Sequence, residues 1–386
     1  MIHELKKIWR PINVLVCLIL LAGMMWTLYT SMYNGAPFLR DGMVSAWSST
    51  LKNDDPTSFV QEQYADLDGY LTKLQMQYMM SDSESERGET LAEINSVETR
   101  SGEYTDSLPF DLLILSRVKE RLEHVDSLQE EWDNEQAILL RTIKRKKLMG
   151  SEAETLNARS EKYATLSVPA YANIDPYEDF VEWNTRYAYV ILLPIIWIVA
   201  QNIPLEKKSG MGDMIRSIAK VPRKIACCKI AAGCFSACII VTVQFACGLG
   251  LSICMAGGIS GLNTGIQALY DMGKCYWDIP IYMLLIYQFV SQCVLAVFTA
   301  SLTMIITTHI QDEWMAIPIA VFSLLIPNLL FILYPKVKAL DMASVFGVLT
   351  PMSSNSWDTA AYIAVALIAT IVISGYTSWR FVRRRS

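Results

Sequence analysis

The chain has 386 residues, 52% of them hydrophobic, and its mean hydropathy of +0.28 excludes an ordinary soluble protein. Its formal net charge is −5 at pH 7, and acidic residues clearly outnumber basic ones over residues 33–185. We interpret that excess as a solvated acidic face; attraction of a cationic ligand is the alternative.

Six apolar runs are long enough to cross a bilayer, which takes about 20 mostly apolar residues in a helix. Their aliphatic stretches are continuous and do not alternate with polar residues, which favours helices over the strands of a barrel. The sequence therefore predicts an all-α, polytopic membrane protein with six transmembrane helices. The runs cover residues 12–32, 187–203, 225–256, 280–308, 315–334 and 359–378.

The first run, residues 12–32, follows a basic, amphipathic amino terminus (1–11) and is either a signal peptide or an uncleaved transmembrane helix. Its apolar core is longer than the ~7–15 residues of a signal-peptide core, and no clear small-residue cleavage site follows. We therefore expect an uncleaved first span.

Orientation follows from Lys and Arg near the ends of the spans, which favour the cytoplasm. The amino terminus, the loop 204–229 and the tail 379–386 are basic, and with six spans all three lie on the same side. The sequence thus predicts a multi-pass protein of the cell membrane with both termini in the cytoplasm. Residues 33–185 are then an extracytoplasmic domain inserted between spans 1 and 2, and residues 186–386 carry spans 2–6.

The extracytoplasmic domain is predicted to be helical, because apolar residues recur at three- and four-residue spacing in two stretches. A single helix cannot bury its own apolar stripe, so we expect the two helices to pack in an antiparallel helical stalk or small bundle. We expect a further helix over 151–166. The first stripe comprises Leu115, Val118, Leu122, Val125, Leu128 or Gln129, Trp132 and Leu139. The second comprises Phe59, Tyr64, Leu67, Tyr70, Leu71, Leu74 and Met79.

The stretch "IDPYEDF" signals the start of another helix, with Asp175 as its N-cap and Pro176 in its first turn. Acidic Glu178 and Asp179 suit the positive end of that helix. We expect it to continue through Tyr187 into the second span.

Motifs of catalysis, metal binding and nucleotide binding are absent from the sequence. The three histidines are far apart, and the nearest approach to a P-loop, "ALYDMGKC", has Ala268 and Cys275 at the essential Gly and Ser/Thr positions. No cysteine falls within residues 33–185; a disulfide between Cys254 and Cys275 is the one pairing left open. We expect no catalytic, cofactor or metal site in this chain, hence no enzyme.

Amide and hydroxyl side chains are the main polar groups inside the predicted spans. They indicate either hydrogen bonds between helices or the lining of a substrate path, and both readings stay open. The candidates for such a path are Gln244, Gln288, Ser291, Gln292 and Asn328.

The basic loop between the second and third apolar runs reads "PLEKKSGMGDMIRSIAKVPRKIACCKI". Its glycines allow a turn, "DMIRSIAK" fits a short amphipathic helix, and Pro222 ends it. The loop resembles the cytoplasmic segment between spans 2 and 3 of ABC-2 type transporter permeases, in the branch with a large external domain between spans 1 and 2. The positions that carry the resemblance are Glu206, Gly210, Met214, Ile215, Ser217, Pro222, Arg223 and Lys229. Ile218 shares the apolar face of the short helix with Met214 and Ile215, and we assign it to the same coupling loop.

This resemblance implies a permease subunit that exports a substrate and is driven by a separate ATP-binding-cassette ATPase, which docks on the loop. It implies a second permease chain, identical or related, with ATP and magnesium bound by the ATPase and not by this chain. Membrane lipid is the remaining partner, and no nucleic acid is expected. The main alternative is a membrane sensor or signalling receptor with an external helical ligand-binding domain; a membrane-embedded enzyme is disfavoured by the missing motifs.

Overall fold

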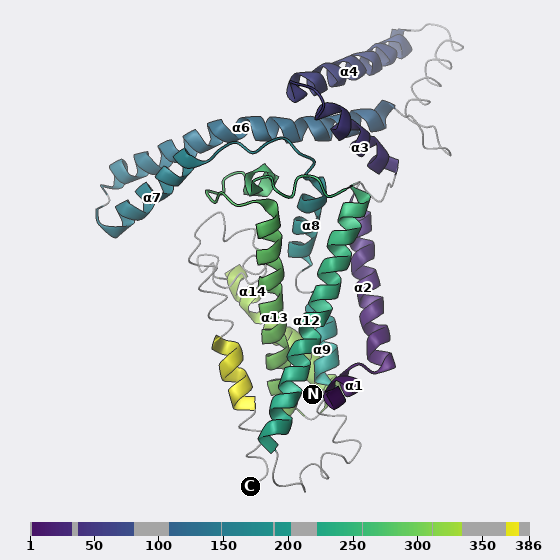
Figure 1. Cartoon of the computed structure of the whole chain (residues 1–386), viewed down its shortest axis with the longest axis vertical. Helices are drawn as coiled ribbons and strands as arrows, with labels where there is room; N and C mark the ends of the chain where they lie inside the picture. The colour runs from purple at the N-terminus through teal and green to yellow at the C-terminus, as the bar shows by residue number, and fades with distance from the viewer. Residues whose placement is uncertain are drawn as a thin grey trace. The chain divides into compact units, whose positions relative to one another are not determined.

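A computed structural model describes residues 2–32, 38–80, 108–147, 149–187, 190–201, 222–256, 258–310, 312–333 and 368–377 (Figure 1). Within these ranges the protein is helical and has no β-strand, only an isolated bridge between Gly265 and Pro280. The predicted all-α class is therefore confirmed for the described residues.

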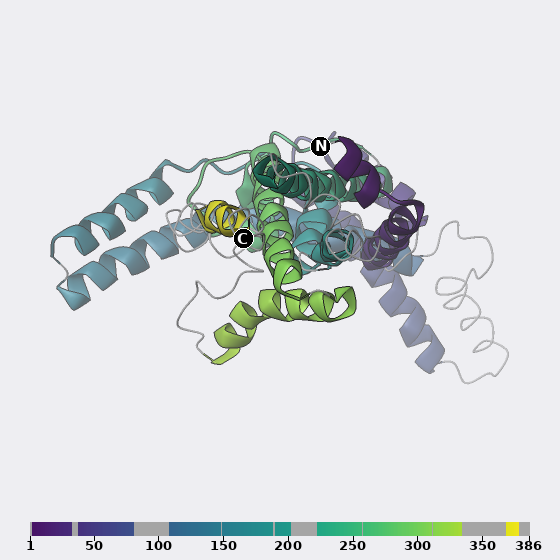
Figure 2. The same ribbon diagram turned by 90° about the horizontal axis from the view of Figure 1, so that it is seen from below.

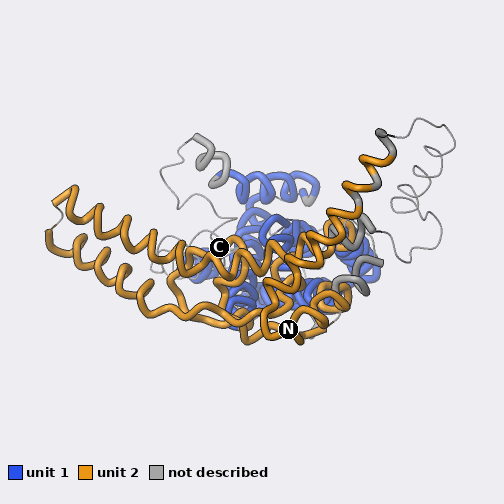
Figure 3. The backbone as a smooth tube through the Cα atoms, turned by 90° about the horizontal axis from the view of Figure 1, so that it is seen from above, with its two compact units in different colours: residues 1–28, 180–251, 283–386 blue, residues 29–179, 252–282 orange. Residues whose placement is uncertain are grey.

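The chain forms two compact units, coloured separately in Figure 3. Unit 1 comprises residues 1–28, 180–251 and 283–386, and unit 2 comprises residues 29–179 and 252–282. The segment 252–282, between the third and fourth apolar runs, thus belongs to the same unit as 29–179. The sequence analysis did not predict that association.

Unit 1 contains the apolar helices. Helices α2 (Pro11–Ser31), α12 (Pro222–Met255) and α13 (Ile281–His309) are each mainly in this unit, together with α1 (Ile2–Ile8), α9 (Leu192–Ala200) and α14 (Glu313–Leu333). Three stretches, Pro11–Ser31, Cys227–Met255 and Ile281–His309, are long and apolar enough to cross a membrane, which identifies a membrane protein. Two shorter apolar helical stretches are Trp314–Ile326 and Ile368–Thr377.

The expected continuation of the Asp175 helix into the second span is wrong. Helix α8 (Asp175–Arg186) ends before Tyr187, and α9 starts afresh at Leu192 and has only 9 residues. The physical reason is Pro194, which has no N–H to donate and is tolerated only in the first turn of a helix. In this position it fits the start of α9 but not the interior of one long helix.

Two glycines of α12 allow close helix packing within unit 1. A Cβ atom at Gly248 would lie 2.9 Å from Cε2 of Phe180, and one at Gly233 would lie 2.4 Å from the flexible end of Met304. Near the start of α2, Trp9 Nε1 donates to Ser236 Oγ at 3.1 Å. Ile8, Ile198 and Ala232 form a small buried cluster there.

Unit 2 is built around the long helix α6 (Leu108–Lys146), which lies beside α7 (Ser151–Thr165), as both Figure 1 and Figure 2 show. Helices α3 (Phe38–Thr50) and α4 (Pro56–Met80) also contact α6. Two short 3-10 turns, η2 (Ile266–Ala268) and η3 (Tyr270–Met272), complete the unit. The helix predicted over 151–166 is confirmed.

The first predicted stripe is the core of unit 2, since Val118, Leu122, Leu128 and Trp132 are at most 1% exposed. Part of the stripe packs against α7 and the 258–282 segment: Trp132 Nε1 donates to the carbonyl of Gly273 at 2.7 Å. Leu128 and Trp132 cluster with Tyr163 and Tyr276.

The second stripe is only partly buried. Phe59, Tyr64 and Leu67 are half-buried, Tyr70 is 44% exposed, and Val60, which lies outside that stripe, is fully buried. The side chains of Leu71, Leu74 and Met79 lie outside the described structure. Periodicity therefore identified the helix, but among its described side chains the most buried one is not in the stripe.

Candidate functional site

Four of the five residues proposed to line a substrate path are buried in unit 1. Gln244 on α12 and Gln288, Ser291 and Gln292 on α13 are at most 1% exposed. The fifth, Asn328, is in α14, and its side chain lies outside what the structure describes. The apolar neighbours on these helices make such burial expensive unless each polar group finds a partner.

Two residues of α8 that sequence analysis missed complete this polar cluster. Gln244 Nε2 donates to Asn184 Oδ1 at 3.2 Å, and Gln288 Nε2 donates to Thr185 Oγ1 at 3.3 Å. Asn184 follows the buried Tyr177 and Phe180 at helical spacing, which would have placed it on the buried face of α8. The prediction of one continuous helix into the second span concealed that signal.

Ser291 is satisfied within its own helix, since its hydroxyl donates to the carbonyl of Tyr287 at 2.8 Å. It therefore lies beside Gln288 and Gln292 on the polar face of α13 without offering a free donor. On this face of α13, the amide of Gln292 is the group without a partner among the described residues.

Several buried atoms of this amide cluster have no partner among the described residues. They are Gln244 Oε1, Asn184 Nδ2, and both Nε2 and Oε1 of Gln292. Buried polar groups are normally hydrogen-bonded, so orphaned ones call for an explanation such as a ligand, an ion or water. Together they offer both donors and acceptors and no formal charge.

Aromatic residues neighbour the amides along α12 and α13 and pack against one another. The Phe180 and Phe245 centroids are 4.9 Å apart, and those of Phe245 and Phe289 are 5.3 Å apart, both pairs edge-to-face. Because Gln244 precedes Phe245 and Gln288 precedes Phe289, the rings and the amides occupy the same level of α8, α12 and α13. Packing between these rings holds α8, α12 and α13 together and so fixes the positions of the backbones that carry the amides.

An almost wholly apolar cavity of about 210 Å³ borders the cluster in unit 1. It lies between α2, α9 and α12, with Leu18, Pro194 and Ile240 among its walls, and Gln244 is its one amide-bearing lining residue. A smaller apolar cavity, of about 150 Å³, is already able to stay dry and hold a benzene-sized molecule.

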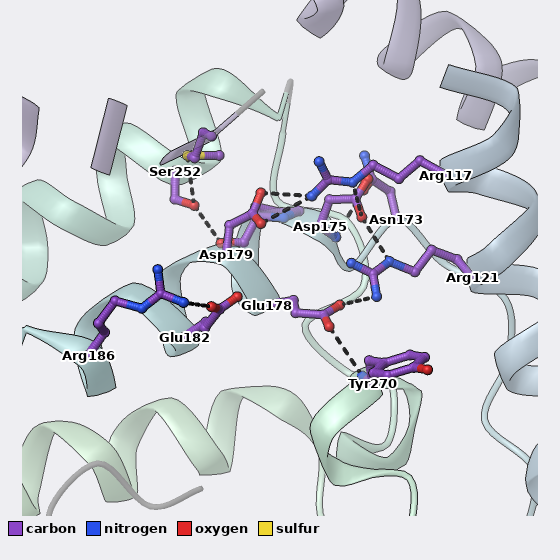
Figure 4. A network of polar contacts seen from close by, with 12 residues as sticks. Arg117, Arg121, Asn173, Asp175, Glu178, Asp179, Glu182, Arg186, Ser252 and Tyr270 are labelled. Atoms are coloured by element: carbon purple, nitrogen blue, oxygen red, sulfur yellow. Dashed lines mark hydrogen bonds and ion pairs between the residues drawn. The ribbon is translucent and has the colours of Figure 1, made fainter. Parts of the chain in front are cut away.

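Unit 2 contains a separate network of buried charges (Figure 4). Arg117 Nη2 donates to both carboxylate oxygens of Asp179 at 3.1 Å. Arg121 pairs with Asp175 at 3.2 Å and with Glu178 at 2.6 Å. The side chain of Asp175 is fully buried.

The expected role of Asp175 as the N-cap is wrong: Asp175 is the first residue of α8, and the carbonyl of Ile174 accepts the hydrogen bond from Glu178 N–H. The side chain of Asp175 instead joins several helices of unit 2. Its second oxygen accepts a hydrogen bond from Trp47 Nε1 at 3.2 Å, so α3, α6 and α8 meet at this carboxylate. The backbone N–H of Tyr270 donates to Glu178 Oε1 at 3.3 Å, which ties the 258–282 segment to the same network.

Three carboxylates face two guanidinium groups here, so the fully ionised network carries one excess negative charge. Burial raises the pKa of Glu178 to about 7, against the opposing attraction of Arg121. Burial likewise raises the pKa of Asp179 to about 6, against the attraction of Arg117. Binding of one proton to one of these carboxylates near neutral pH neutralises the excess negative charge.

The loop residues that carry the permease resemblance are outside the described structure, with three exceptions: Pro222, Arg223 and Lys229, the last of which is buried in α12. Glu206, Gly210, Met214, Ile215, Ser217 and Ile218 lie in the undescribed stretch 202–221. Pro222 is the first residue of α12 and Arg223 the second, although nothing is described of their side chains. Proline is favoured at that first helical position because no N–H is needed there.

Potential metal ligands do not gather in the described part of the chain, where no group of three or more His, Cys, Asp or Glu could hold an ion. All nine cysteines are free thiols, so the disulfide left open between Cys254 and Cys275 is not formed.

The fold and these sites define a helical membrane protein. Its unit 1 contains a buried cluster of neutral amides, and its unit 2 contains a network of buried ion pairs. Comparison with known proteins yields no match to any family model, curated protein or solved structure. The function is therefore argued from the chain's own residues.

Proposed function

We propose that this chain is the membrane-spanning permease subunit of an ATP-binding-cassette exporter, driven by a separate ATPase subunit. The observation that carries the proposal is the cluster of buried, partly unpartnered amides on three helices, Asn184, Gln244 and Gln292 among them. A neutral polar cluster suits a molecule that is bound and released, because no charge has to be desolvated.

The alternative role for such amides is to hold helices together. Hydrogen bonds between membrane helices average only about 0.6 kcal/mol, and they require that donor and acceptor meet. The Gln288–Thr185 contact serves that purpose, whereas Gln292 makes no such bond with any described residue. An amide kept in the interior without a partner favours a ligand-binding role.

The proposed topology has six spans, both termini in the cytoplasm, and residues 33–185 outside the cell membrane. With this topology the segment between spans 3 and 4 also lies outside. The association of residues 29–179 with 252–282 in one compact unit supports that arrangement, because segments that pack together are on the same side of the membrane.

The energy source in this proposal is external to the chain. The described part of α13, Ile281–His309, contains no Asp, Glu, Lys or Arg, which transport coupled to ions usually requires. The loop 204–229 supplies the docking surface for the ATPase, and ATP and magnesium are bound there by the ATPase. A second permease chain completes the path.

The experiment is to purify the tagged full-length protein from its native membrane and to identify the proteins that stay bound to it. We expect a P-loop ATPase at a fixed ratio, together with ATP hydrolysis that is lost when that ATPase is removed. A preparation that is pure, folded and free of any ATPase under several mild detergents would contradict the permease reading and favour the sensor.

A further inference from the structure

Unit 2 contains a cavity of about 610 Å³ that plays no part in the proposed transport path. It lies between two irregular segments, residues 167–172 and 259–265, and Asp278 also lines it. Small-molecule and peptide-sized sites commonly measure about 300–1,000 Å³. The cavity is thus large enough for part of a ligand.

One wall of the cavity is an extended segment with an unused backbone edge. After α7 the chain leaves the helical conformation at Leu166, with φ −68° and ψ 142°, and residues 166–174 form no regular structure. Among the described residues, the backbone N–H and C=O groups of Val168, Ala170 and Ala172 make no hydrogen bond. Alternate residues of an extended chain direct these groups to the same side, so the three form one edge.

Pro169 has no N–H to donate, but it lies between Val168 and Ala170 and so removes no donor from these three residues. An unpaired extended edge is a template on which another extended chain can add.

The other wall is held rigidly by backbone pairing. Ile281 N–H donates to the carbonyl of Thr264 at 2.9 Å, and Tyr282 N–H donates to that of Leu262 at 3.1 Å. Gly261 has φ +80°, and a Cβ atom there would lie 2.8 Å from the carbonyl oxygen of Asn173. The glycine therefore fixes a close approach of the two walls at one end of the cavity.

The side chains at the cavity indicate the composition of its ligand. Val168 is 43% exposed and Ile259 is 64% exposed, so apolar surface is open to a partner. Asp278 is the only charged residue in the lining, and it is exposed. A ligand with apolar groups and one positive charge complements these walls.

We propose that this cavity binds an extended peptide carrying a basic residue, whose backbone pairs with the edge formed by Val168, Ala170 and Ala172. Side chains of an extended peptide alternate between two faces, so apolar residues meet Val168 and Ile259 while the basic residue meets Asp278. This inference goes beyond the proposed function and does not depend on it.

The test uses immobilised, detergent-solubilised full-length protein and a pool of random hexapeptides with blocked ends, with retained peptides measured by mass spectrometry. We expect retention of a pool enriched in Lys and Arg. An identical pool with N-methylated backbones should be retained at least fivefold less, since it lacks the donors that pair with the edge.

Two matched pairs of variants locate the binding. Ala170→Pro removes one backbone donor of the edge and should lower retention roughly fivefold, whereas Ala170→Val keeps that donor and should not. Asp278→Asn should abolish the enrichment in Lys and Arg, whereas Asp271→Asn, outside the cavity lining, should preserve it. If thermal melting shows that Ala170→Pro disturbs the fold, the comparison of the normal and N-methylated pools on the wild-type protein alone decides whether binding uses the backbone edge.

Equal retention of the normal and N-methylated pools would overturn the proposal, because binding would then not use the backbone edge. Retention of no peptide by the wild-type protein, or identical retention by the folded Pro and Val variants, would overturn it as well.

Discussion

The side-chain amides of Asn184 and Gln244 face each other across α8 and α12, with the Gln244 nitrogen 3.2 Å from the Asn184 oxygen and both residues 1% exposed. Their second polar atoms, Gln244 Oε1 and Asn184 Nδ2, have no partner among the described residues. Within the described residues, the pair therefore uses only two of its four amide polar atoms.

We predict that this pair is dispensable for stability but not for transport. Asn184→Leu or Gln244→Leu alone leaves the remaining amide buried and unpaired, at a cost of about 1–3 kcal/mol. The double Leu variant should lose less than the sum of the two single variants. A double-mutant cycle on the free energy of unfolding, with ATPase stimulation as the functional readout, measures both effects. A fully active double variant would leave the pair as helix packing alone.

Gln292 offers a sharper version of the same test, because neither polar atom of its amide has a partner among the described residues. Gln292→Leu removes a buried unsatisfied group and should stabilise the protein by about 1–2 kcal/mol while it lowers transport activity. Ser291→Ala is the neighbouring control, since that hydroxyl bonds within its own helix and its loss should change activity little. Thermal unfolding and ATPase assays on both variants check this. An unstable but fully active Gln292→Leu protein would contradict the role proposed for this amide.

Local patterns predicted the helices well and their partners less well. The α6 stripe was identifiable because Val118, Leu122 and Trp132 recur on one face of a long amphipathic helix. Its packing against residues 258–282 was not, because that segment lies more than a hundred residues away and carries no periodic pattern. The break before α9 follows from Pro194, whose effect depends on whether it falls in a first turn or in a helix interior.

For the candidate site, too, single residues could be predicted from the sequence but their partners could not. Glutamines in apolar runs were visible as candidates, but their partners Asn184 and Thr185 were assigned to an external helix. The buried charges of unit 2 were visible only as single residues: Asp175 and Glu178 fitted a helix start, while no sequence pattern distinguishes Arg117 and Arg121 from the other charged residues of α6. Only tertiary structure brings the five charged groups together.

The unit 2 network makes a pH-dependent prediction. Because burial raises the pKa of Glu178 to about 7 from a usual value near 4.5, its stabilising contribution is present at acidic pH. That contribution is lost as the pH rises through about 7. The variant Glu178→Gln removes the excess negative charge and should gain roughly 1–3 kcal/mol over wild type at pH 8, with little gain at pH 5.

Hydrogen exchange of the α6 amides in the full-length protein, corrected for intrinsic rates, gives the free energy of opening at each pH. Glu182→Gln is the matched control, since Glu182 is on the same helix but exposed and paired with Arg186. A Glu178→Gln protein that loses stability equally at both pH values would show that the Arg121 ion pair dominates.

The proposed topology predicts which side of the membrane each unit occupies. In a variant without its nine cysteines, Glu130→Cys on the exposed face of α6 should react with a membrane-impermeant maleimide in intact cells. Lys208→Cys should react only after the membrane is opened. Labelling of position 130 from the cytoplasmic side alone would contradict both the topology and the permease reading.

The central claim is the proposal that an ATPase drives this chain through the loop 204–229, where the sequence predicts a short helix with Ile215 and Ile218 on its apolar face. The most direct measurement is substrate-stimulated ATP hydrolysis and co-purification of the ATPase for the double variant Ile215→Asp, Ile218→Asp. We predict that hydrolysis loses its stimulation and that less ATPase co-purifies, because apolar contacts dominate such interfaces. Charge reversal of Lys207 and Lys208 should disturb membrane insertion more than coupling. Normal complex formation and normal stimulated hydrolysis in the double Asp variant would contradict the account.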